Sequence, residues 1–379
     1  KKGILRFILR GPNLPKMMPL ICLKPWSKSQ TMTNEREQFL INNQMNRRIM
    51  RRTSNVQRVH FIYSSKYANY IIPFLKHHGI MDSPPWICCN TLARKPDFYN
   101  AGTHSFFIAD YYLYSYIFDF NYCFSSQKHE EYYINVLLKA IIEKLYVSKN
   151  INECYTLAKY APDIESYKSD SSYRCESIIV PIIEKSDFQE EFIFLHEASH
   201  FLWRSSPNTP TFSFPEGVTY NIPVNDTTID LKQECYCDYL SFSYIFDYSL
   251  PSTPAIIYRQ ISAIVEILHY IFVLQLVDSS SIQSTSYSVL NFHTITDVIN
   301  FRISCIRQYL ITFLQSQGLA TESFISFFDE VQVAFNGLIH DTLSIFSVVS
   351  EVIKENSPDF SSIQTSEKNL YLHEYLKLL

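Results

Sequence analysis

The sequence predicts an α+β protein that is mostly helical, with a small sheet in its first part and a C-terminal helical bundle. Three long segments after residue 250 place apolar residues at helical spacing, at 256–277, 295–315 and 322–354. Short runs of β-branched and aromatic residues in the preceding part favour strands. With 7 glycines in 379 residues, against 28 phenylalanines and 27 tyrosines, the composition also suits a helix-rich protein with an aromatic core.

The elements before residue 190 are predicted from shorter patterns. Alternating or continuous apolar runs indicate strands, and apolar residues three and four apart indicate helices. The stretch at 101–124 is rich in aromatic residues and is expected to form either a strand or a plain core hairpin. The expected elements are, in order, a helix at 35–52, a strand at 59–63, a helix at 69–76, the strand within 101–124, a helix at 129–147, an irregular insertion at 150–172 and a strand at 177–183.

The length of the chain allows two or three domains with a large core. Hydrophobic residues make up 46% of the sequence, which is typical of a globular protein. We expect a basic N-terminal arm and helix at 1–58, a domain with the sheet at 59–250, and a helical region at 251–379.

The charge of the chain is strongly polarised. Residues 1–58 contain 13 lysines and arginines against two acids, so the rest of the chain carries a net charge of −15 within a total of −4. A basic arm can bind nucleic acid, but it can also dock on its own acidic body or remain solvated. Because no nucleic-acid-binding motif accompanies the charge, nucleic acid is not an expected partner.

The cysteines and the longest apolar run bear on the location of the protein. The 9 cysteines show no framework spacing, which favours a reducing compartment and a cytoplasmic protein. Arg6 and Arg10 interrupt the apolar stretch near the N-terminus, so no secretory signal is expected. The apolar run at 261–277 is shorter than the roughly 20 residues that a membrane helix needs. It also contains Glu266 and His269, which favours a buried bundle helix and no membrane span.

One apolar helix, at 192–203, carries the residues with the clearest chemistry. His196 and His200 stand four residues apart, so both imidazoles leave the same helix face and can converge on one ion. Glu197 follows the first histidine, where a carboxylate can act as the general base for a zinc hydrolase. Large apolar neighbours would make these polar groups costly to bury without a metal. A capping box at Ser186 predicts the start of the helix.

A zinc site needs a third protein ligand, and two glutamates compete for this role. Glu234 and Asp238 lie four residues apart on one helix face. Glu234 could therefore reach the metal while Asp238 accepts the ring N–H of a ligating histidine and fixes its tautomer. Glu216, in a Glu216-Gly217 pair, is closer to the histidines in sequence but lacks such a partner. We prefer Glu234, with Glu216 as the alternative.

The pattern His196-Glu197-x-x-His200 followed by Glu234-x-x-x-Asp238 resembles the gluzincins, the HExxH zinc metallopeptidases whose third ligand is a glutamate. Among them it is most similar to the ImmA/IrrE-like bacterial metallopeptidases. The resemblance implies a zincin-like metallopeptidase core that binds Zn²⁺. It also implies that the domain at 59–250 is the catalytic domain.

A further similarity lies downstream and extends the resemblance over about residues 97–310. The segment from His293 to Arg302 is similar to a His-Pro…Arg element in several such families, although Thr294 stands in place of the proline. Such enzymes stabilise the oxyanion with a tyrosine or histidine. Tyr220 and His293 are the candidates for this role.

The resemblance implies a zinc-dependent endopeptidase that hydrolyses peptide bonds in a specific intracellular protein target. A bacterial regulatory or phage-defence protease fits this expectation. Its partners would be a protein or peptide substrate and, as a further candidate, a regulatory protein. The alternative is a catalytically silent zincin scaffold that acts as a protein-interaction module.

Overall fold

The computed structural model describes most of the chain after residue 65. The described residues are 66–82, 84, 86–89, 96–101, 104–110, 113–125, 129–164, 168, 173, 175–205, 212–218, 227–249, 253–279 and 289–378. The predicted helix at 35–52 and strand at 59–63 lie outside the described residues.

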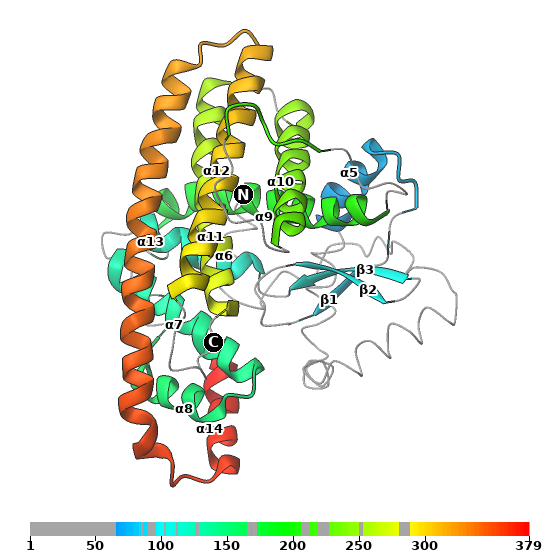
Figure 1. Ribbon diagram of the computed structural model, residues 1–379. Helices are drawn as coiled ribbons and strands as arrows, with labels where there is room; N and C mark the ends of the chain where they lie inside the picture. The colour runs from blue at the N-terminus through cyan, green and yellow to red at the C-terminus, as the bar shows by residue number, and fades with distance from the viewer. Residues whose placement is uncertain are drawn as a thin grey trace.

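Helices build almost all of the described structure, as Figure 1 shows. The three described strands have only four, five and seven residues, and they lie together at one side of the helices. The prediction of an α+β fold with a zincin-like core built on a sheet is therefore wrong, and the protein is a helical one. The reason is physical: most apolar runs of the first half bury their side chains in helix-on-helix contacts, where aromatic and β-branched residues pack as well as they do in strands.

The small sheet has the strand order β1-β3-β2 and rests against helix α9 (Glu176–Ser205). Its strands are β1 (Trp86–Cys89), β2 (Asp97–Ala101) and β3 (His104–Asp110). Strand β3 runs parallel to β1 and antiparallel to β2. The ring of Phe107 in β3 is fully buried, 5.3 Å from the ring of Phe194 between their centroids. This aromatic contact joins the sheet to helix α9. Of the stretch at 101–124, residues 104–110 form β3, paired antiparallel with β2, and residues 113–124 belong to a helix, which neither the single strand nor the plain hairpin predicted.

Helix α9 (Glu176–Ser205) is 30 residues long, and its first turns replace the strand predicted at 177–183. Ile179, Ile182 and Ile183 are buried at helical spacing, so the β-branched run forms one helix face. Pro181 lies inside the helix but is exposed, so its ring does not disturb that face. The predicted start at Ser186 is also wrong, because Ser186 is fully buried in the middle of α9.

Other helices surround α9 and hold it near the centre of the molecule (Figure 1). Helix α9 packs against α6, α10 and α11, while α12 packs against both α10 and α11. The core therefore lies between helix faces, and α12 lies beside two of the helices that pack against α9. These neighbours are α6 (Leu113–Ser125), α10 (Thr227–Tyr244), α11 (Pro254–Ser279) and α12 (Val289–Ser316).

The long helices predicted after residue 250 are confirmed as α11, α12 and α13 (Glu322–Asn356). Helix α13 runs along the length of the molecule in Figure 1. The helix predicted at 129–147 is confirmed as α7 (His129–Val147). At 69–76 the structure has a π-helical turn and a short helix. The remaining described elements are η1 (Tyr67–Ile71), α5 (Ile72–His77), α8 (Ile151–Tyr160), η4 (Ile245–Ser249), η5 (Ser357–Phe360) and α14 (Thr365–Leu378).

The predicted irregular insertion at 150–172 is wrong in its first part, because α8 forms there and packs against α13 and α14. Cys154 and Leu157 are buried in α8 at helical spacing among polar residues. The polar residues on the other face had masked this amphipathic pattern. The domain limits at 58 and 250 stay a prediction.

Two helices of the described chain are long and apolar enough to cross a membrane. They are 254–277 and 322–360, and most of the first is buried inside the protein, whereas most of the second is not. The burial of α11 agrees with its prediction as a bundle helix. This finding rests on the length and composition of the two helices alone.

Candidate metal centre

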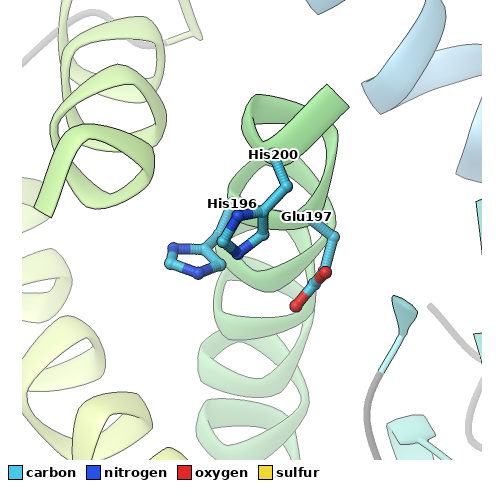
Figure 2. A group of neighbouring side chains, drawn as sticks. All are labelled: His196, Glu197 and His200. Atoms are coloured by element: carbon cyan, nitrogen blue, oxygen red, sulfur yellow. The ribbon is translucent and has the colours of Figure 1, made fainter. Parts of the chain in front are cut away.

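His196, Glu197 and His200 form the one group of metal-ligating side chains found among the described residues. One ligand atom from each residue lies within 4.8 Å of the others. Figure 2 shows the two imidazoles and the Glu197 carboxylate projecting together from α9. The two histidines are buried, and Glu197 is half-buried. The i, i+4 spacing on a regular helix thus produces the predicted convergence.

Glu234 of α10 brings its carboxylate to both histidines. Its Oε2 lies 3.2 Å from Nε2 of His196, and its Oε1 lies 3.4 Å from Nε2 of His200. Ligands bound tetrahedrally to Zn²⁺ at about 2.0–2.1 Å lie about 3.3–3.4 Å from one another. The side chain of Glu234 is 28% exposed, so one side of the group is open to solvent. The Glu234 carboxylate is thus close enough to both imidazoles for the three side chains to share one divalent metal ion.

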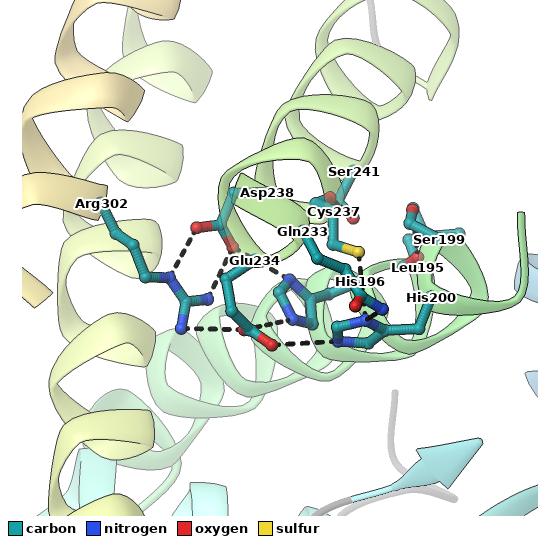
Figure 3. Close-up of polar contacts among 10 residues, drawn as sticks. All are labelled: Leu195, His196, Ser199, His200, Gln233, Glu234, Cys237, Asp238, Ser241 and Arg302. Atoms are coloured by element: carbon teal, nitrogen blue, oxygen red, sulfur yellow. Dashed lines mark hydrogen bonds and ion pairs between the residues drawn. The ribbon is translucent and has the colours of Figure 1, made fainter. Parts of the chain in front are cut away.

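Asp238 lies one turn further along α10 and approaches the other ring nitrogen of His196. Its Oδ1 is 2.9 Å from Nδ1 of His196, and its side chain is fully buried. A carboxylate in this place favours a proton on Nδ1, which would leave Nε2, the nitrogen that faces Glu234, to bind a metal. The predicted pair, Glu234 and Asp238, therefore lies at the two ring nitrogens of one imidazole (Figure 3).

Arg302 of α12, the arginine of the His293–Arg302 element in the sequence, completes the group, although the sequence analysis gave it no specific role. Its Nε and Nη2 donate hydrogen bonds of 2.7 and 2.8 Å to the two carboxylate oxygens of Asp238. Its Nη1 lies 3.2 Å from Oε2 of Glu234. The side chain is fully buried. A single cation between apolar neighbours such as Phe301 and Ile303 is the signal that could have revealed it, since a buried arginine needs a carboxylate.

The charges of this cluster balance when no metal is bound. Burial alone would lower the pKa of His196, but Asp238 and Glu234 outweigh it and raise this pKa to about 10. Burial lowers the pKa of His200 to about 4. Burial would raise the pKa of Glu234 and of Asp238, but Arg302 and His196 hold both below their ordinary values. Two carboxylates thus face two cations, and a metal must displace the proton of His196.

His200 makes its own contacts with α10 through Nδ1. The amide Nε2 of Gln233 lies 2.8 Å from this ring nitrogen, and Sγ of Cys237 lies 3.4 Å from it. Figure 3 shows both side chains beside His200, on the ring edge away from Glu234. Neither residue was among the predicted site residues. Only the position of Gln233 next to Glu234 could have indicated it.

The other predicted site residues do not join this group in the described structure. Glu216 is exposed, in a turn where Gly217 has a positive φ of 83°. Of the two candidates for the third ligand, the geometry favours Glu234. His293 lies in the first turns of α12, with its side chain outside the described residues, and Tyr220 lies outside them entirely.

Comparisons of the chain with protein-family models, with curated proteins and with solved structures find no match. The chemistry of the site therefore depends on its own geometry. That geometry brings together two imidazoles that can be neutral, the Glu234 carboxylate between them, and the Glu197 carboxylate beside them on α9. This is a donor set that could hold a divalent metal, with a further carboxylate next to it.

Proposed function

We propose that the protein is a zinc-dependent peptidase in which His196, His200 and Glu234 hold the metal. The observation that carries this proposal is the position of the Glu234 carboxylate, 3.2 and 3.4 Å from the Nε2 atoms of the two histidines. Two histidines and one glutamate are a known ligand set of catalytic zinc, which keeps its fourth position for water or substrate. The peptide bond as substrate rests on the resemblance of the motifs.

The residues around the ligands have roles that follow from their positions. Zinc, when bound, would polarise the scissile carbonyl and make a water acidic enough to attack near neutral pH. Glu197 would take the proton from that water and deliver it to the leaving amine. Asp238 would hold His196 in the tautomer that directs Nε2 to the metal.

Arg302 would act through the two carboxylates rather than on the substrate. It binds Asp238 with two hydrogen bonds and also approaches Glu234, so it fixes the relative position of both. Because its positive charge holds the pKa of both acids low, Glu234 stays ionised as a ligand. Arg302 is thus a positioning residue for the metal ligands.

The proposal is tested by comparing the full chain with Glu197→Gln. Both proteins, loaded with zinc and dialysed, are incubated with a peptide mixture from a digested proteome, and new peptide ends are counted by mass spectrometry. We expect equal zinc in both, and cleavage in the variant reduced by roughly 10²–10⁴-fold because the general base is lost. Glu184→Gln, an exposed change on the same helix, should cleave like the natural sequence.

Two results would decide against the proposal. Absence of zinc from the natural sequence would remove the metal site. Equal cleavage by Glu197→Gln would remove the general base. Zinc binding with no cleavage by either protein would favour the silent interaction module over the peptidase.

A further inference from the structure

The two histidines of the site present Nδ1 to different residues of α10. His196 faces Asp238, whereas His200 faces Gln233 at 2.8 Å and Cys237 at 3.4 Å. Positions 233 and 237 are one turn apart, as are positions 234 and 238, so the same stretch of helix serves both rings. The partner of His196 is an obligatory acceptor, but the partner of His200 is an amide.

A metal-ligating histidine must be neutral and must keep its proton on the nitrogen that faces away from the metal. For His200, Nε2 faces Glu234 and Nδ1 faces Gln233. The metal-binding tautomer therefore needs an acceptor at the position of the Gln233 amide. A glutamine offers this acceptor when its amide turns by half a rotation, because its Oε1 and Nε2 exchange places with almost no change of shape.

We propose that Gln233 is the positioning residue for His200, accepting the Nδ1–H proton on Oε1 and so directing Nε2 to the metal. The inference rests on the proposed zinc site and adds to it the residue that selects the tautomer of its second histidine. With the amide nitrogen turned to Nδ1 instead, Gln233 donates to the ring and the proton sits on Nε2. The amide thus accommodates the metal-free and the metal-loaded protein, which a carboxylate or an amine in its place would not.

Cys237 is the competing partner of the same ring nitrogen. Its sulfur is further away, and a thiol is a weak donor and a weak acceptor. It lies on the ring edge opposite Glu234, so it is not placed as a ligand on the metal side. Cys237→Ala should therefore change zinc binding less than the loss of the Gln233 amide does.

The test measures zinc affinity of the full chain by competition with a chelator. Gln233→Leu, which removes the acceptor, should weaken zinc binding by roughly 10–100-fold, the usual effect of losing a hydrogen-bond partner of a metal-ligating histidine. Gln233→Glu, which keeps an acceptor oxygen, should bind zinc at least as tightly as the natural sequence. Gln233→Lys, which can only donate, should bind no better than Gln233→Leu. Lys232→Leu, next along α10, is the matched control, and circular dichroism of each metal-free variant checks the fold.

A second measurement reads the tautomer itself. Nitrogen-15 spectra of histidine-labelled, zinc-loaded protein should show His200 with its proton on Nδ1 and slow exchange of that proton with water. In Gln233→Leu the same proton should exchange faster. The inference is overturned if Gln233→Leu binds zinc like the natural sequence, if Gln233→Glu is as weak as Gln233→Leu, or if the Nδ1 proton exchanges equally in both. Failure of the natural sequence to bind zinc at all would instead remove the proposed function.

Discussion

At the scale of single residues, the site is held by a set of buried charges that compensate one another. Arg302 and Asp238 are fully buried, and each would be very costly to bury alone. Their two hydrogen bonds join them directly, and Glu234 and His196 lie on either side of the pair. The same charges place the metal ligands, so stability and metal binding are expected to fail together.

Arg302→Met should destabilise the metal-free protein by about 3–5 kcal/mol, because it leaves the Asp238 carboxylate buried without its partner. Urea unfolding followed by circular dichroism measures this change. Arg307→Met is the matched control, since Arg307 also binds a carboxylate, that of Asp329, with two hydrogen bonds from α12. Its pair is partly exposed to solvent and should contribute only about 0–1 kcal/mol. Equal losses in the two variants would contradict this account of the buried cluster.

His269 on α11 should make the stability of the protein depend on pH. Burial lowers its pKa to about 3, and its Nε2 lies 2.9 Å from the hydroxyl of Tyr133. The folded state thus binds a proton less readily than the unfolded state, in which the pKa is near 6.5. Stability from this residue is complete above pH 6.5 and falls by about 1.4 kcal/mol per pH unit as the pH drops towards 3. His269→Phe should show a correspondingly flatter profile in urea unfolding at several pH values, and an unchanged slope would refute the assignment.

At the scale of the elements, α9 shows what local sequence patterns miss. Its first turns contain a β-branched run that favours a strand, and only the packing of that run against neighbouring helices makes it helical. Its centre contains Ser186 and Gln189, polar residues that resemble a helix start. They are instead buried partners of Asn121 on α6, whose Nδ2 donates to the Ser186 hydroxyl at 2.8 Å and to Gln189 Oε1 at 2.6 Å. Neither contact could be inferred without the tertiary fold.

This polar contact between α6 and α9 should be measurable as a coupling. Asn121→Ala should cost about 1–3 kcal/mol, because it leaves the buried groups of Ser186 and Gln189 without their donor. Ser186→Ala alone should cost less, and the double variant should lose less than the two single losses together. A double-mutant cycle from urea unfolding is expected to give a coupling energy of about 0.5–3 kcal/mol. Additive losses would mean that the two side chains do not depend on each other.

At the scale of the whole molecule, the site exists only because three helices far apart in sequence meet. Helix α9 supplies the histidines, α10 supplies Glu234 and Asp238, and α12 supplies Arg302 (Figure 3). Regular spacing within one helix made the first two sets predictable, since residues four apart share a face. The packing of α12 against α10, and of α10 against α9, is recorded by no local pattern, and the contacts of Arg302 with Glu234 and Asp238 depend on it. The predicted α+β fold class was wrong for the same reason.

The most direct test of the central claim is the zinc content of the purified protein by elemental analysis. We expect about one zinc per chain in the natural sequence and in Glu216→Ala. Three protein ligands fill three positions of one tetrahedral site and leave the fourth position open. His196→Ala and Glu234→Ala should lose the metal while circular dichroism shows that their helices remain. Full zinc in Glu234→Ala together with loss of zinc in Glu216→Ala would contradict the claim and assign the third ligand to the exposed turn.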